Sequence, residues 1–118
     1  MFSEIDVSAP VYVHTGAADM RLGIDRLLTL VGEYNPLVGG YFVFFSRKKE
    51  RVRILYWDRD GYCVWLKRLE VGAFKVDSST AAVATITVEC LRELLSGVEL
   101  KRVIFRNKMA QKGSMISL

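Results

Sequence analysis

Two stretches of alternating residues, separated by a short polar break, give this chain its most distinctive pattern. Residues 52–57 alternate β-branched, basic and aromatic side chains, and residues 62–69 resume a strand-like pattern. Successive side chains of a strand point to opposite faces of a sheet, so such alternation is typical of β-strands. The break at 58–61 reads Asp-Arg-Asp-Gly; Asp favours the start of a turn, and Gly61 can adopt the positive φ that closes one. The pattern predicts an antiparallel hairpin.

The length of the turn determines which side chains of the hairpin share a face. A three-residue loop at 59–61 gives the cross-strand pairs Trp57 with Cys63, Leu55 with Trp65, and Arg53 with Lys67. One face then carries an aromatic and basic set: Arg53, Leu55, Trp57, Trp65 and Lys67. The other carries a set that we assign to the core, with Arg68 at its edge: Val52, Ile54, Tyr56, Val64, Leu66 and Arg68. Large aromatics on a sheet are more often core than ligand-binding, so both interpretations of the first face stay open.

The remaining pattern predicts two helices and further strands. Apolar residues at helical spacing follow Asp19, which can cap a helix running to about residue 33: Met20, Ile24, Leu27, Leu28 and Val31. Thr87 can cap a second helix over 88–96, with Leu91, Leu94 and Leu95 on one face. Strands are expected at 11–14, 41–46 and 72–76, with a short one at 103–105. We therefore expect an α+β fold: an antiparallel sheet of about four to five strands, with two helices packed on one face through Ile24, Leu27, Val31, Leu91 and Leu95.

Composition indicates one globular domain, residues 1–118, with residues 101–118 forming a basic, loosely held C-terminal extension. The chain is 51% hydrophobic, yet no apolar run is long enough to cross a bilayer, and the first ten residues do not resemble a signal peptide. We expect a cytoplasmic protein without a membrane partner. Cys63 and Cys90 are expected to be reduced, and the sequence does not determine an oligomeric state.

Positive charge is concentrated in the hairpin region. The net charge of +4 divides into −3 for residues 1–46, +5 for 47–68 and +2 for 69–118. Lysine and arginine neutralise phosphates, and exposed aromatic rings can stack on unpaired bases. The candidate nucleic-acid-binding residues are Arg47, Lys48, Lys49, Arg51, Arg53, Trp57, Trp65, Lys67 and Arg68. The alternative is a solvated basic loop that binds nothing.

Catalytic chemistry has little support in the sequence. His14 is the only histidine and has no metal-ligand spacing around it. Asp58 and Asp60 flank the predicted turn, which accounts for them without a metal, and no phosphate-binding glycine motif is present. We predict no cofactor, no metal site and no catalytic residue.

Several motifs in one order resemble a known family. A Trp-Asp-x-x-Gly turn is followed by a Lys-Arg-Leu-Glu-x-Gly-x-Phe segment: Trp57, Asp58, Gly61, Lys67, Arg68, Leu69, Glu70, Gly72 and Phe74. Upstream lie an Asp-Met-Arg-x-Gly motif and a Phe-x-Phe strand with a basic loop: Asp19, Met20, Arg21, Gly23 and Asp25, then Phe42, Val43, Phe44 and Arg47. Together they resemble the accessory protein encoded by the second reading frame of the IS-sixty-six (IS66) class of bacterial insertion sequences.

The resemblance implies a non-catalytic protein that supports DNA transposition alongside a separate transposase, which carries the strand-cleaving carboxylates. Charge adds the expectation that the basic and aromatic hairpin binds nucleic acid, DNA in the first instance. The competing hypothesis is a protein-interaction module that docks the transposase, or another element-encoded protein, without touching nucleic acid.

Overall fold

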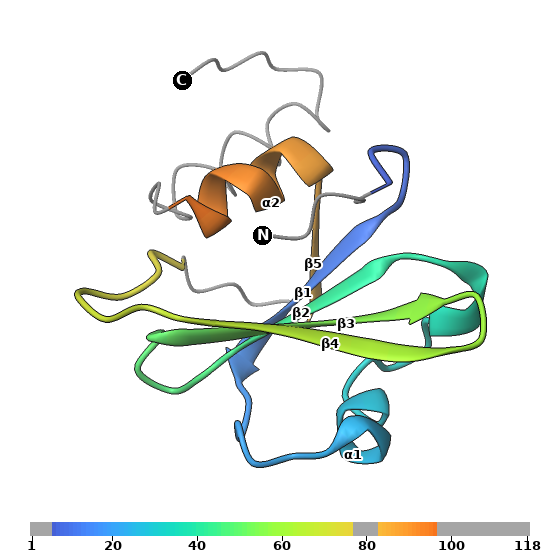
Figure 1. Cartoon of the computed structure of the whole chain (residues 1–118), viewed down its shortest axis with the longest axis horizontal. Helices are drawn as coiled ribbons and strands as arrows, with labels where there is room; N and C mark the ends of the chain where they lie inside the picture. The colour runs from blue at the N-terminus through green and yellow to red at the C-terminus, as the bar shows by residue number, and fades with distance from the viewer. Residues whose placement is uncertain (1–5, 77–82, 97–118) are drawn as a thin grey trace.

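The computed structural model describes residues 6–76 and 83–96 of the chain. In this part, five strands form one sheet with the spatial order β4-β3-β2-β1-β5 (Figure 1). The strands are β1 Val11–Ala17, β2 Tyr41–Phe45, β3 Arg51–Asp58, β4 Gly61–Arg68 and β5 Val83–Ile86. The helices are α1 Ile24–Leu28, a 3-10 helix Pro36–Val38, and α2 Val88–Leu95. The α+β class and the five-stranded sheet are confirmed.

The sheet is mixed rather than purely antiparallel. Strand β1 runs parallel to β2, whereas the β1–β5, β2–β3 and β3–β4 pairs are antiparallel. Parallel neighbours need a long crossover connection, which residues 18–40 supply with α1 and the 3-10 helix. The expectation of an all-antiparallel sheet was therefore wrong at this one pair.

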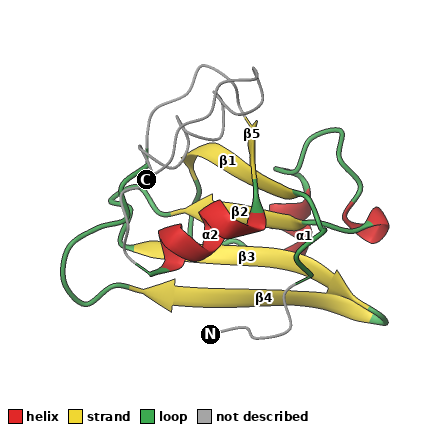
Figure 2. Ribbon diagram, turned by 90° about the horizontal axis from the view of Figure 1, so that it is seen from above, coloured by secondary structure: helices red, strands yellow, loops and turns green. Residues whose placement is uncertain are grey.

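The two helices lie on opposite faces of the sheet, which corrects the prediction that both cover one face (Figures 1 and 2). The cause is the central strand β2, in which all five side chains are buried. Val43 and Phe45 face the core formed with α2, whereas Phe42 and Phe44 face the core formed with Leu27 of α1. A strand that is apolar on both faces needs cover on both, so the helices cannot pack together through Leu27 and Leu91.

Helix α1 is much shorter than predicted and does not start at Asp19. Its N-cap is Gly23, which offers no side-chain cap. The Asp19 carboxylate instead accepts a hydrogen bond from the amide of Arg21 (2.9 Å), and the Asp19 carbonyl accepts one from Leu22 (3.1 Å). This local turn competes with helix formation, as short acidic side chains often do. Ile24, predicted to be core, is exposed.

The predicted hairpin is confirmed, but its register differs by one residue. The loop contains two residues, because Asp58 pairs with Gly61 and Trp57 pairs with Tyr62. Arg59, not Gly61, takes the left-handed conformation, with φ of 52°. Since side chains alternate, this shift moves every β4 residue to the face opposite the predicted one.

The sheet edge beyond β1 was also mispredicted. Residues 72–76 do not form the expected strand, although Phe74 is buried against Phe45 and its amide donates to the Lys49 carbonyl (2.7 Å). Strand β5 supplies the fifth strand instead.

Helix α2 is confirmed, with the Thr87 hydroxyl accepting from the Cys90 amide (3.1 Å). The predictions for 103–105 and 101–118 lie outside the described residues.

Candidate nucleic-acid interface

An open groove lies on the β3–β4 half of the sheet face that α1 covers only in part. It encloses about 530 Å³. Its lining combines three arginines with an apolar floor: Arg51, Arg53, Arg68, Met20, Val64 and Leu66. We call these six residues the arginine groove. Leu66 is 57% exposed, so the floor is accessible to a ligand.

Arg51 and Arg68 face each other directly across the β3–β4 pair. Like charges in this position destabilise a sheet, so the arrangement is one that folding alone does not favour. Arg68 is partly compensated, because its Nε donates to Glu70 Oε2 at 2.8 Å. Arg51 is exposed and makes no ion pair within the described residues. Its guanidinium is therefore available to an anionic ligand.

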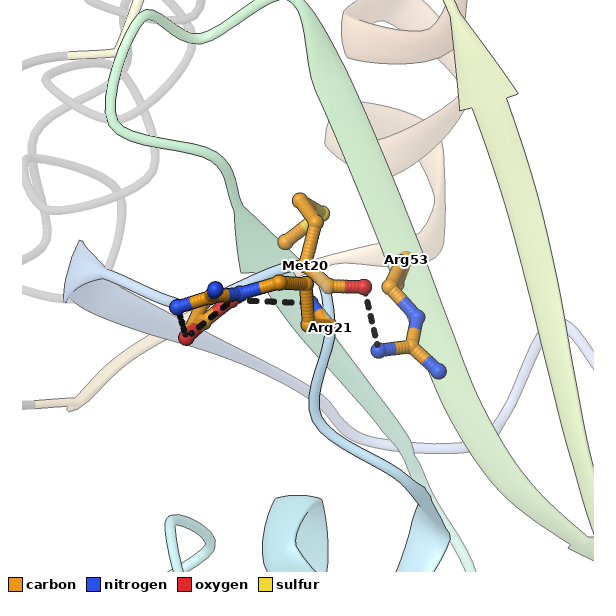
Figure 3. A network of polar contacts seen from close by, with 4 residues as sticks. Met20, Arg21 and Arg53 are labelled. Carbon is orange, nitrogen blue, oxygen red and sulfur yellow. Dashed lines mark hydrogen bonds and ion pairs between the residues drawn. The ribbon is translucent and has the colours of Figure 1, made fainter.

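Arg53 lines the groove and also holds the chain segment before α1 against the sheet (Figure 3). Its Nη1 lies 3.5 Å from the Met20 carbonyl, which is the contact drawn in the figure. The same nitrogen donates to the Leu22 carbonyl at 2.6 Å. Next to this clamp, the Arg21 guanidinium bonds the Asp19 carboxylate and lowers the pKa of Asp19 to about 2. The Asp-Met-Arg motif is thus a turn held against the sheet, and it places Met20 on the groove.

The basic turn between β2 and β3 adjoins the same end of the groove. The Ser46 hydroxyl accepts hydrogen bonds from the amides of Glu50 (3.2 Å) and Arg51 (3.1 Å), and Lys49 takes a positive φ of 61°. This turn holds Arg47 and Lys48 exposed, immediately before Arg51. Four predicted basic residues therefore share one end of the hairpin with Arg68: Arg47, Lys48, Lys49 and Arg51.

Two predicted site residues lie on the opposite face. Lys67 donates from Nζ to the carbonyl of Leu95 at 2.6 Å, at the C-terminal end of α2. A cation there satisfies a free helix carbonyl and suits the helix dipole. Trp65 packs against the core beneath α2. Neither residue can share a footprint with the arginine groove.

Trp57 is also separated from the groove. It lies six residues along β3 from Arg51, about 20 Å at strand spacing. Its ring packs edge-on against Tyr62, with centroids 4.9 Å apart and an interplanar angle of 72°. The predicted mixed platform of tryptophans and basic residues is therefore not assembled.

The sequence interpretation missed the apolar floor of the groove. Val64, Leu66 and Arg68 were correctly placed on one face, but that face was assigned to the core. The signal was available in Arg68 itself, because a core face seldom carries an arginine beside its apolar residues. Met20 could not have been found, since its position depends on the clamp formed by Arg53.

Two acidic residues at the hairpin, Asp58 and Glu70, have structural partners. Asp58 lies 3.6 Å from the Arg59 guanidinium, and Glu70 pairs with Arg68. His14 is paired through Nδ1 with the Gly16 carbonyl at 3.1 Å. Within residues 6–76 and 83–96, no three His, Cys, Asp or Glu side chains converge on a possible metal position. In the same ranges no helix is long and apolar enough to span a bilayer.

These features define a small α+β protein with a basic groove on an open sheet face. The chain belongs to the family described as IS66 Orf2 like protein, whose model matches residues 9–110, and the protein is thus an accessory protein of an insertion sequence. The resemblance drawn from the sequence motifs is confirmed.

Two similar proteins come from Sinorhizobium fredii (strain NBRC 101917 / NGR234). The uncharacterized protein y4hO is 36% identical over 92 residues, covering 75% of this chain and 80% of that protein. The uncharacterized protein y4jC is 31% identical over 96 residues, covering 79% and 82%. No solved structure was found to match the chain.

Proposed function

We propose that this protein supports transposition by binding nucleic-acid phosphates, in the first instance those of DNA, at the arginine groove and the adjoining basic turn. The observation that carries the proposal is the direct cross-strand pairing of Arg51 with Arg68. Two arginines paired directly across neighbouring strands repel each other until an anion lies between them. A phosphate between them turns that repulsion into two charge-assisted contacts.

The proposed footprint is smaller than the one expected from charge alone. It contains Arg47, Lys48, Lys49, Arg51 and Arg68. Arg53 is left out because its guanidinium holds the Leu22 carbonyl. Trp65 and Lys67 are left out because they face α2, and Trp57 because it lies at the far end of the strand. Strand cleavage is assigned to the transposase, and this protein is proposed to be non-catalytic.

Duplex DNA of random sequence, titrated at several salt concentrations, tests the proposal. Phosphate contacts make log affinity fall linearly with log salt, by about 0.9 for each duplex phosphate neutralised. Arg51→Met should flatten the slope by about that amount, and Lys48→Ala with Lys49→Ala should flatten it further. Single-stranded DNA and RNA of equal length, which give about 0.7 per phosphate, identify the preferred form.

The matched control is Arg92→Met. Arg92 is an exposed arginine of α2, on the opposite face of the sheet, so it changes the net charge equally. It should leave the slope unchanged if binding is localised to the groove. Equal effects of Arg51→Met and Arg92→Met, or a slope near zero for the unmodified protein, would refute the proposal and favour the protein-interaction alternative.

A further inference from the structure

Strand β4 ends the sheet on one side, and its outer edge is long. It spans eight residues, and within the described part of the chain it pairs only with β3. The opposite edge, β5, has only four residues. An exposed strand edge presents unpaired amides and carbonyls that can pair with another strand, and proteins commonly limit this by keeping edge strands short.

The hydrogen-bond phase of the hairpin shows which residues present these groups. The Leu69 amide donates to the Glu50 carbonyl at 2.8 Å, in register with the β3–β4 ladder. Bonding alternates along an antiparallel pair, so the odd-numbered residues of β4 bond to β3. The even-numbered residues turn their amides and carbonyls outward: Tyr62, Val64, Leu66 and Arg68.

Strand β4 has few of the features that usually protect such an edge, and Arg68 at its end is the one charged residue among the four outward-bonding ones. Between Gly61 and Arg68 there is no proline, and the ladder with β3 runs without a bulge. Lys67, which could guard the edge, is bonded to the carbonyl of Leu95 instead. Leu66 remains 57% exposed beside the edge.

We propose that a second copy of this chain pairs with β4, antiparallel, with Val64 opposite the partner's Val64. Charge selects both the occupant and the register. Asp60 lies in the turn just before β4 and Arg68 is the last residue of β4, so an antiparallel copy brings Asp60 near the partner's Arg68, twice by symmetry. Within the described residues, Asp60 has no cation at ion-pair distance.

The same register also pairs the outward backbone groups of β4 and covers its exposed leucine. Every outward-bonding residue meets an outward-bonding residue, because the paired numbers are both even. Tyr62 lies opposite the partner's Leu66, which covers the exposed leucine with an aromatic ring. Such cross-strand aromatic–aliphatic pairs stabilise sheets.

The dimer would be a continuous ten-stranded sheet with a two-fold axis perpendicular to it. Such an axis leaves each face on its own side, so both arginine grooves open in the same direction. Arg68 takes part in both proposals, but the pairing needs no nucleic acid, so its test does not depend on the proposed function. Two grooves on one surface would, however, give an extended anion a larger footprint than one chain offers.

Cysteine cross-linking tests the register, with Cys63 replaced and Cys90 left in place because it is buried. In a Cys63→Ala background, Val64→Cys places two thiols on residues whose Cα atoms are about 5.5 Å apart, within disulfide range. Leu66→Cys is the matched control, on the same face. Its thiols would be four residues out of register, about 13 Å apart along the strands. Mild oxidation of the purified protein without nucleic acid should give a covalent dimer for Val64→Cys alone.

Sedimentation analysis over a range of concentrations tests the pairing itself. The unmodified protein should shift from the mass of one chain to that of two. Val64→Pro removes an outward amide, which an edge strand tolerates, together with the valine side chain, and should give one-chain mass at every concentration. Val64→Ala loses the same side chain but keeps the amide, and should still dimerise. A one-chain mass for the unmodified protein throughout, or cross-linking of Leu66→Cys as fast as Val64→Cys, would overturn the proposal.

Discussion

Two arginines on β3, Arg51 and Arg53, are expected to differ in how much the fold depends on them. Both line the arginine groove, and both face the same side of the sheet because they lie two residues apart on β3. Arg53 is half-buried and donates to the Leu22 carbonyl at 2.6 Å, whereas Arg51 is exposed. We predict that Arg53→Met destabilises the fold and that Arg51→Met does not.

The magnitude follows from the bonds that Arg53 makes. One short hydrogen bond from a charged donor contributes about 1.5–3 kcal/mol, and the contact to the Met20 carbonyl, at 3.5 Å, adds little. Methionine retains most of the apolar stem, so the change removes the guanidinium and little packing. Arg53→Met should therefore lower the free energy of unfolding by about 1.5–3 kcal/mol. Arg51→Met should stay within about 0.5 kcal/mol of the unmodified protein.

Urea unfolding followed by circular dichroism measures both values. The slope of free energy against urea should be unchanged, because the buried surface is unchanged. The thermal midpoint of Arg53→Met should fall by roughly 6–12 °C, at about 4 °C per kcal/mol. Destabilisation by Arg51→Met as large as that by Arg53→Met would contradict the division of roles, as would a neutral Arg53→Met.

Three further predictions concern the other face, α2 and catalysis. Lys67→Met should lower the free energy of unfolding by about 1–3 kcal/mol, because the Leu95 carbonyl loses a charged donor. It should leave the salt dependence of DNA binding unchanged, and an altered salt slope would contradict the placement of Lys67 outside the footprint. Thr87→Ala should cost about 0.5–2 kcal/mol through loss of the N-cap of α2, seen as a lower urea midpoint, whereas Thr87→Ser should cost much less. The purified protein should not cleave DNA with Mg²⁺ or Mn²⁺; cleavage that disappears in Asp58→Asn or Glu70→Gln would disprove the non-catalytic assignment.

The sequence predicted the hairpin well but could not predict its facing pairs. Alternation determines that a strand exists, whereas the loop length determines which side chains meet, and one residue of difference moves Trp65 and Lys67 to the other face. The glycine at position 61 favoured a longer loop closed by Gly61. The structure closes the turn with a left-handed Arg59, a conformation that non-glycine residues adopt less readily.

The placement of the helices was missed for a different reason. Helix periodicity identifies an apolar face but not which side of a sheet it covers. The unbroken apolar run of β2 did carry that information, because a strand buried on both faces requires two layers of cover. Asp19 was a sound cap candidate locally, but its carboxylate bonds Arg21 in a local turn, and the clamp by Arg53 holds that turn against the sheet.

The number of basic residues in the hairpin segment is larger than the number of basic side chains that can contact a phosphate. Residues 47–68 contain eight basic side chains. Four of them have partners in the fold, as Arg53, Arg59, Lys67 and Arg68 bind a carbonyl or a carboxylate. The other four make no side-chain hydrogen bond or ion pair within the described residues: Arg47, Lys48, Lys49 and Arg51.

The two counts predict different salt dependence for duplex DNA. Eight phosphate contacts would give a slope of about −7 per chain, whereas four give about −3.6. The proposed footprint adds part of Arg68, whose ion pair with Glu70 is exposed and easily exchanged, so we expect a value between about −3.6 and −4.5. A slope near −7 would mean that Lys67 and Arg53 leave their carbonyl partners on binding. The fold described here would then have to open at α2 and at the turn before α1 when DNA binds.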